Sequence, residues 1–418
     1  MKITEKTIEV SEDQSTKTEH LQLASESTIS HYITLLLAIA AGIAVANIYF
    51  AHPLLDTLSM DLSIDHSTIG IVITITQICY ALGLLLLVPL GDLLNPRRLI
   101  LGQMLLIIVA LVIVGFATSK AVFFIGLTGV GILATVTQSL VAYASKLSSL
   151  AERGRIVGFV TSGIVIGILL ARTFAGILTD LGGWRLVYLT SAALMLIMVG
   201  LLYKQLPNVK FEHSALTYPK LLRSVILLFV QERILLIRGV LALFIFTAFS
   251  ILWTSLVLPL SAQPYSLSHT AIGAFGLAGV AGALAAARAG KLADRGLGQR
   301  TTGIALILLL ASWIILSLMN FSLLLLVIGV ILLDLAVQAV HVTNQIIIFT
   351  VRPESRSRLT AAYMIFYSIG SATGSIASTT IYESFGWDGV CLLGGSVSAL
   401  ALLFWGLTYH ITELVREK

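Results

Sequence analysis

Charged residues are scarce in this chain of 418 residues. Asp, Glu, Lys and Arg make up 11% of it, whereas 57% is hydrophobic. A soluble domain has about 25% charged residues, because a surface in contact with water needs charge and a surface in contact with lipid excludes it. The deficit excludes a soluble globular protein, a disordered chain and a nucleic-acid binder. It predicts a chain whose main partner is the lipid bilayer.

Cysteine and the common catalytic motifs are also nearly absent. The two cysteines, Cys79 and Cys391, both lie in apolar runs, so we expect neither a disulfide framework nor a metal cluster. The chain has no phosphate-binding glycine loop, no His-Glu-x-x-His and no Gly-x-Ser-x-Gly. We therefore expect no cofactor and no ATP-driven pump. A membrane-embedded enzyme stays a remote alternative, with Asp334 and His341 as its best available pair.

Apolar segments long enough to span a bilayer recur from residue 32 onward. A spanning helix needs about 20 largely apolar residues, and twelve segments qualify, six on each side of a gap at 205–238. The predicted spans are 32–54, 68–90, 99–117, 121–145, 156–178, 185–204, 239–260, 271–290, 302–319, 322–349, 359–382 and 389–409.

The spans form two groups of six, with a linker between the groups and a polar tail at each end of the chain. Within the gap, the short apolar run Val225–Val230 is flanked by charges, which is typical of a helix on the membrane surface. The polar N-terminal segment lacks the apolar core of a secretory signal. We expect a cytoplasmic tail at 1–30, a six-helix bundle at 31–204, a linker at 205–238, a second bundle at 239–410 and a tail at 411–418.

The Lys and Arg residues predict the orientation. With the N-terminus inside, the tails and the loops after even-numbered spans hold 23 of the 26 basic residues, and the opposite side holds only Lys120 and Arg185. Arg172 is left inside span 5. Cytoplasmic loops carry the excess of Lys and Arg in membrane proteins. The sequence therefore predicts that both termini are cytoplasmic.

The two halves repeat each other. The segment PLGDLLNPRR at 89–98 and the segment GKLADRGLGQR at 290–300 each place an Asp at a helix end and an Arg six residues later, at an offset of 202. Gly183-Trp184 before span 6 matches Gly386-Trp387 before span 12. Repeated halves are typical of secondary transporters.

These motifs resemble the major facilitator superfamily, and within it the bacterial drug:proton antiporter-like group. NIYFAHPL at 47–54 and GILLART at 167–173 are similar to that group. The resemblance implies an all-α membrane protein, with twelve transmembrane helices in two pseudo-symmetric six-helix bundles around a central cavity. It also implies a cytoplasmic gate latched by Asp92, Arg97, Arg98, Asp294, Arg295 and Arg300.

One acidic residue, Asp334, lies deep within a span. Asp334, Gln338, His341 and Gln345 follow at steps of four, three and four, which puts them on one helical face. A polar stripe cannot face lipid, so it faces protein or a water-filled cavity. We interpret Asp334 as the proton-binding group of a substrate path, with His341 as a second candidate. The alternative is a structural hydrogen-bond network.

One basic residue, Arg172, lies equally deep. It is 17 residues from Arg155, and Asp334 is 18 residues from Arg352, so both lie roughly 25 Å from the cytoplasmic loops at 1.5 Å per residue. Equal depth permits an interaction with Asp334. Arg172 is thus a candidate for an anion or substrate site or for a switchable partner of Asp334, and the alternatives are a static pair or snorkelling to the far interface.

Further polar and aromatic residues in the spans are candidates for substrate contact, although residues of these types more often pack or lie at the membrane interface. The full predicted set is Asn47, Tyr49, Gln77, Tyr80, Gln138, Arg172, Trp253, Gln338, His341, Asn344, Tyr363 and Tyr367.

These observations together predict a secondary transporter that moves a small organic molecule by alternating access. We expect a monomer coupled to protons, with export favoured by the family resemblance. The alternative is an uptake symporter or facilitator for a metabolite such as a sugar or an organic acid.

Overall fold

The computed structural model describes residues 30–149, 152–207, 217–279, 288–350 and 356–416, and the side chains of 293–294, 356–357 and 411–416 lie outside its described part. Within these ranges the chain is helical and contains no strand. The predicted tail at 1–30, part of span 271–290 and part of the linker fall outside the described residues.

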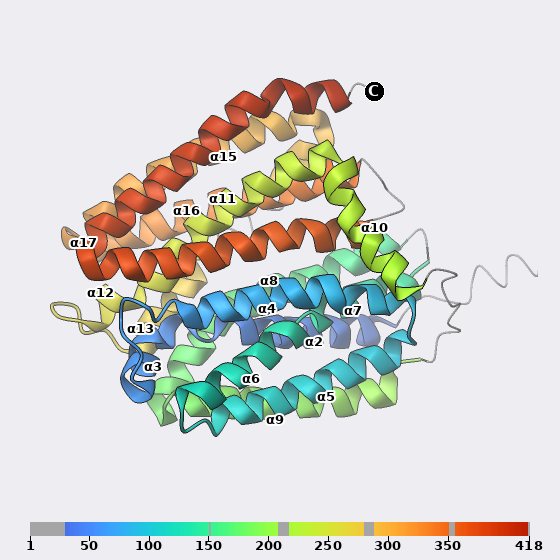
Figure 1. Ribbon diagram of the computed structural model, residues 1–418, viewed down its shortest axis with the longest axis horizontal. Coiled ribbons are helices and arrows are strands. Elements are labelled where there is room, and N and C mark those ends of the chain that lie inside the picture. Colours follow the sequence, from blue (N-terminus) through green and yellow to red (C-terminus); the bar gives the residue numbers. More distant parts are fainter. Residues whose placement is uncertain (1–29, 150–151, 208–216, 280–287, 351–355, 417–418) are drawn as a thin grey trace, which may run out of the picture.

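The first half of the chain forms six spans, three of which continue through a break in the helix (Figure 1). Its elements are α2 (His31–Tyr49), η1 (His52–Leu54), α3 (Leu55–Leu62), α4 (Ile71–Leu86), η2 (Val88–Asp92), α5 (Pro96–Gly115), α6 (Lys120–Leu133), α7 (Val136–Leu147), α8 (Arg153–Gly182) and α9 (Trp184–Gln205).

The second half repeats this order after α10, which lies within the predicted linker. Its elements are α10 (Tyr218–Gln231), α11 (Arg233–Ser255), α12 (Val257–Ser261), α13 (His269–Ala274), η3 (Phe275–Ala278), η4 (Ala293–Leu297), α15 (Gly298–Leu316), η5 (Ser317–Asn320), α16 (Leu323–Phe349) and α17 (Arg356–Arg416).

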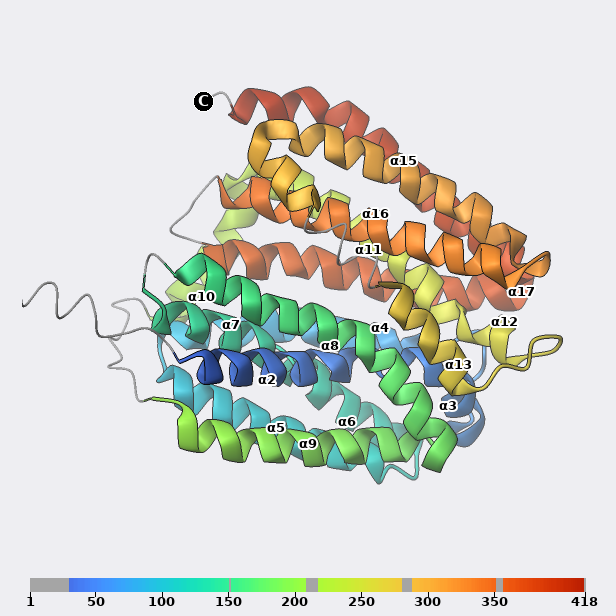
Figure 2. The ribbon, with the colours of Figure 1, turned by 180° about the vertical axis from the view of Figure 1, so that it is seen from behind.

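Ten helices among the described residues are long and apolar enough to cross a membrane. The last of them is interrupted at Gly386, where φ is +62°, so α17 comprises two spans joined by a sharp turn. Together with the partly described segment that begins at α13, this gives the twelve spans of the predicted fold, arranged as two bundles (Figures 1 and 2).

Polar residues at the loop ends determine where several helices begin. The Ser322 hydroxyl accepts the N–H of Leu324 at 3.1 Å, and the Asn95 side chain accepts the N–H of Arg98 at 3.3 Å. Pro96 occupies the first helical position, where its missing N–H costs no hydrogen bond. Side-chain acceptors of this kind satisfy N–H groups that the helix itself leaves unpaired.

The two bundles meet along two pairs of helices, α4 with α17 and α8 with α13. Thr74 donates to the Ala372 carbonyl at 2.8 Å, and Thr380 donates to the Ser67 carbonyl at 3.1 Å. These contacts lie at the end of the molecule that holds α3, α12 and α13, hereafter the α13 end. The bundles diverge toward the opposite end, hereafter the α10 end, where the C-terminus lies (Figure 1).

Close backbone contact at the α13 end depends on glycine. A Cβ on Gly70 would lie 2.8 Å from Oγ1 of Thr379, and a Cβ on Gly273 would lie 3.0 Å from the carbonyl carbon of Arg172. Thr173 also donates to the Gly273 carbonyl at 3.0 Å. Small residues let membrane helices approach each other closely, and here they close one end of the interface between the bundles.

Candidate functional site

The polar stripe of α16 changes in exposure along its length. Asp334 is buried, with 3% of its surface exposed, whereas Gln338, His341 and Gln345 are partly exposed. Because α16 runs from the α13 end toward the α10 end (Figure 1), the carboxylate lies at the deep end of the stripe. The partly exposed residues of the stripe therefore lie nearer the α10 end than Asp334 does.

Asp334 and Arg172 are connected by Trp253. The indole Nε1–H of Trp253 donates to Oδ1 of Asp334 at 3.0 Å, and the Arg172 guanidinium carbon lies 3.7 Å from the indole ring centroid. All three side chains are at most 3% exposed. The two charged groups form no direct ion pair among the described residues. An aromatic ring of the second bundle thus stacks on a cation of the first.

Two further rings surround the Arg172 guanidinium. Its central carbon lies 5.5 Å from the Tyr49 ring centroid and 5.4 Å from that of Phe249. Placing an Arg at the centre of a bilayer costs about 2.5–3.5 kcal/mol on insertion scales. A desolvated cation–π contact stabilises the cation by about 2 kcal/mol. The rings therefore offset most of this cost, although no carboxylate of the described residues contacts the guanidinium.

One edge of the Arg172 guanidinium has no partner. Its buried Nε and Nη2 atoms make no hydrogen bond within the described part of the chain. These two nitrogens point their N–H groups in the same direction, which is the fork that binds the two oxygens of a carboxylate. This unpaired edge therefore has the geometry that bidentate binding of a carboxylate requires, and aromatic rings enclose it.

The remaining predicted residues near the site come from both bundles. The hydroxyls of Tyr49 and Tyr367 hydrogen-bond each other across the interface, and Gln77 lies beside Tyr367. In the first bundle, Tyr80 lies beside Gln138. These contacts bring predicted residues of spans 1, 2, 4 and 11 into one polar layer between the bundles.

In the second bundle, the predicted residues on α16 meet α17. The Nδ1 atom of His341 lies 3.0 Å from the Tyr363 hydroxyl, and the Phe246 ring contacts the imidazole with centroids 5.1 Å apart. His341 is thus oriented by a neutral hydroxyl group and an aromatic ring. No acidic side chain within the described residues bonds to it.

Two predicted substrate contacts face into a bundle instead. Asn47 accepts a hydrogen bond from the Ser191 hydroxyl at 2.7 Å, which links α2 to α9 inside the first bundle. Asn344 bonds to Arg238 in both directions, through its carbonyl oxygen at 3.3 Å and through its amide nitrogen to the Arg238 backbone carbonyl at 3.3 Å. Both amides satisfy groups of the bundle that contains them.

Arg238 is a buried cation that the predicted bounds place at the end of the linker at 205–238, on the cytoplasmic side. It is 0% exposed and donates to Oε1 of Gln299 at 2.8 Å and to Oγ1 of Thr302 at 3.4 Å. No acidic residue within the described ranges pairs with it. The only signal in the sequence is its position beside Gly239 at the start of an apolar run, which also fits a loop arginine.

The predicted gate residues lie at the α10 end and remain a prediction. Asp92 ends η2, and Arg97 in the first turn of α5 bonds to the Tyr203 carbonyl, with its guanidinium 5.4 Å from the Tyr203 ring centroid. Arg98 follows in α5, Arg295 lies in η4 and Arg300 in α15. The side chain of Asp294 falls outside the described part.

Two repeated helical bundles with a buried charged site at their interface define a secondary transporter. The model of the Major Facilitator Superfamily matches residues 37–295 and 239–418. The chain belongs to this superfamily, whose members here are transporters and not enzymes, so the embedded-enzyme alternative is set aside.

Relatives and solved structures agree with this family. The uncharacterized transporter YgaY of Escherichia coli O157:H7 is 44% identical over 385 residues, covering 92% of this chain and 98% of its own. A "Probable sugar efflux transporter" of Helicobacter pylori (strain P12) is 20% identical, covering 84% and 88%. The structure of a bacterial homolog of the human lysosomal transporter Spinster, inward-facing and occupied, has a TM-score of 0.72 at 15% identity, covering 92% and 96%.

Two substitutions of Trp253 separate its two contacts. Trp253→Phe keeps a ring beside Arg172 but removes the donor to Asp334, whereas Trp253→Ala removes both. A hydrogen bond to a charged group contributes about 1.5–3 kcal/mol. We expect the thermal unfolding temperature of the purified protein to fall from wild type to the Phe variant and further to the Ala variant.

Trp313→Phe is the matched control, because the buried Trp313 donates to the neutral Ser398 hydroxyl at 3.0 Å. The unfolding temperature should fall less in Trp313→Phe than in Trp253→Phe. Equal losses in the two Phe variants would contradict a charge-assisted bond at Trp253.

Proposed function

We propose that this protein is a proton-coupled secondary transporter that exports a small organic molecule by alternating access. The observation that carries the proposal is the buried Asp334, joined through Trp253 to Arg172 of the opposite bundle. Intramembrane carboxylates mark proton or substrate pathways. A proton on Asp334 changes the charge at the interface between the bundles, so proton binding and bundle movement are linked.

Alternating access is supported by the asymmetry of the interface. The α13 end is closed by backbone contacts through Gly70 and Gly273, whereas Gln338, His341 and Gln345, which lie nearer the α10 end, are partly exposed. If the termini are cytoplasmic, this arrangement is inward-facing. The proposed Asp and Arg latch at the α10 end would hold the opposite state, in which the α13 end opens.

Export is supported by the resemblance to drug:proton antiporters and by the Helicobacter pylori relative, which is described as a "Probable sugar efflux transporter". In an antiporter, substrate and proton bind the same carrier in opposite states. Asp334 suits this role when the substrate is neutral or cationic, because such a substrate takes the place of the proton.

Uptake by symport is the second candidate, and the free edge of Arg172 favours it. An anionic substrate on this edge would be repelled by an ionised Asp334 and would bind best when Asp334 is protonated. The proton and the anion would then occupy the site together and cross in the same direction.

Asp334→Asn tests proton coupling, because Asn matches the carboxyl group in size but cannot release a proton. One proton crossing the membrane field contributes about 2.3 kcal/mol per 100 mV, which is roughly fortyfold in an accumulation ratio. With a substrate identified by a thermal-shift screen, we expect the variant in proteoliposomes to equilibrate it without concentrating it.

The exposed Asp65 provides the control, and Asp65→Asn should accumulate substrate like wild type. Undiminished gradient-driven accumulation by Asp334→Asn would show that another group carries the proton.

Substitution of Arg172, tested with pairs of charged and neutral ligands, distinguishes export by antiport from uptake by symport. Benzoate and indole-3-acetate carry a carboxylate, whereas benzamide and indole-3-acetamide are their neutral analogues. Symport of an anion predicts that only the acids raise the unfolding temperature of wild type and that Arg172→Gln abolishes this effect. Arg185→Gln, at an exposed arginine paired with Asp61 at 3.0 Å, should leave it unchanged. Equal shifts with acids and amides would contradict anion binding at Arg172.

We also propose an inner-membrane location with both termini cytoplasmic, supported by the distribution of Lys and Arg. Alkaline phosphatase fused after Lys418 should be inactive, and a fluorescent reporter at the same position should be active. A fusion after Phe321, in the exposed turn before α16, should give the reverse pattern. An active phosphatase after Lys418 would invert the topology.

A further inference from the structure

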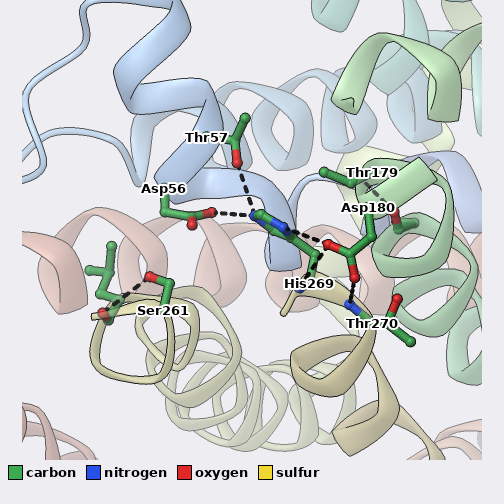
Figure 3. A network of polar contacts seen from close by, with 9 residues as sticks. Asp56, Thr57, Thr179, Asp180, Ser261, His269 and Thr270 are labelled. Carbon is green, nitrogen blue, oxygen red and sulfur yellow. Dashed lines mark hydrogen bonds and ion pairs between the residues drawn. The ribbon is translucent and has the colours of Figure 1, made fainter. Parts of the chain in front are cut away.

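The α13 end holds a cluster of titratable side chains that lies outside the proposed substrate site. His269, the first residue of α13, is held by two carboxylates of the first bundle (Figure 3). Its Nδ1 lies 3.1 Å from Oδ1 of Asp180 on α8, and its Nε2 lies 3.2 Å from Oδ1 of Asp56 on α3. The Thr57 hydroxyl lies 2.9 Å from the same Nε2.

The protonation state of His269 decides which of these bonds can form. A neutral imidazole has one N–H, whereas an imidazolium donates from both nitrogens. Only the charged ring can therefore donate to Asp180 and Asp56 together. In the neutral ring, with its proton on Nδ1, the Nε2 lone pair faces Asp56 and can accept only from the Thr57 hydroxyl.

The carboxylates of Asp180 and Asp56 differ in the number of hydrogen bonds that they make to α13. Asp180 also accepts the backbone N–H of His269 at 3.1 Å and of Thr270 at 2.8 Å, so it caps α13 whether or not the ring is charged. Asp56 has no such second bond to α13. The contact between α3 and α13 is consequently the one that responds to the proton.

Other charged or titratable groups on the neighbouring elements have different partners or lie deeper. On η1, His52 faces the Tyr49 carbonyl at 3.2 Å. On α3, Asp61 pairs with Arg185, and Arg172 on α8 is two helical turns below Asp180. The elements η3 and α12, which also pack near α13, contain no charged residue.

Protons in solution can reach this cluster. The side chains of His269, Asp56 and Asp180 are 22%, 12% and 29% exposed, in contrast to the buried Asp334. The cluster also spans the interface, because His269 belongs to the second bundle and both carboxylates belong to the first. A proton bound here acts directly on the contact that closes the α13 end.

We propose that His269 is a second proton-binding residue of the transport cycle, and that its protonation fastens the two bundles at the α13 end. The proposal rests on alternating access, but it does not require that Asp334 carries a proton.

The direction of the pH effect follows from the two states. In the closed state, the hydrogen bond to Asp56 raises the pKa of His269 above its ordinary value, against the opposing effect of burial. When the end opens, His269 loses both carboxylates and returns toward about 6.5. Closure is therefore favoured fully at pH values below 6.5 and loses this contribution as pH rises through the raised pKa. Each unit of difference changes the closing equilibrium about tenfold.

The test measures closure at the α13 end by pulsed electron paramagnetic resonance. Spin labels at Met60→Cys on α3 and Phe321→Cys before α16 lie on opposite bundles at exposed positions, in a background with Cys79→Ala and Cys391→Ala. In full-length protein in liposomes, we expect the short-distance population to decrease between pH 5 and 9. In His269→Gln this dependence should disappear.

Three further variants make the result specific. His66→Gln, at an exposed histidine near the same end, should respond like wild type. Asp56→Asn should weaken the response, and Asp334→Asn should retain it. The proposal is overturned if wild type shows no pH dependence, if His269→Gln keeps it, or if Asp334→Asn abolishes it. The last outcome would assign the pH response to Asp334. In the separate transport assay, an Asp334→Asn variant that stays coupled to protons would contradict the proposed role of Asp334 but not that of His269.

Discussion

A guanidinium group in the middle of a bilayer must be enclosed by protein, and this constraint on Arg172 ties the two bundles together. Its main contact, the indole of Trp253, belongs to the other bundle, as does Asp334 beyond it. Complete separation of the bundles would expose the cation to lipid, at a cost of about 2.5–3.5 kcal/mol. The bundles are therefore expected to rock about this contact, so that one end closes while the other opens.

The structure places ionisable groups at two depths along this interface. His269 lies near the surface of the α13 end, partly exposed, and its contacts with Asp56 and Asp180 cross between the bundles. Asp334 lies deep, at the buried end of the polar stripe of α16. A proton on the first group changes the stability of one closed state, whereas a proton on the second changes the charge of the central site. On the two proposals above, one group would influence when the transporter opens and the other what it carries.

The family and the twelve-helix fold were predictable from sequence, because the length of the apolar segments and the repeated Asp–Arg loops can be recognised without any knowledge of packing. The contacts between individual side chains could not be predicted from the sequence. Equal depth suggested a pair between Arg172 and Asp334, but it could not reveal that Trp253 lies between them, since helix rotation is set by tertiary contacts. Arg238 looked like a loop residue because its partners Gln299 and Asn344 are 61 and 106 residues away. His269 was missed because its two acids come from the ends of distant spans, where each resembles an ordinary loop charge.

The charge of the substrate links the central site to the direction of transport. Arg172 supplies one positive charge, and Asp334 supplies one negative charge when ionised. A cationic substrate that replaces the proton on Asp334 leaves the charge of the site unchanged, and a neutral substrate that replaces it restores the balance, so in both cases the proton and the substrate are exchanged. An anionic substrate on the free edge of Arg172 adds a second negative charge, and protonation of Asp334 restores the balance, so the two travel together. If Asp334 carries the proton as proposed, electrostatic balance in a water-excluded site would make export by antiport and uptake by symport two outcomes of one arrangement, distinguished by the charge of the ligand that binds there.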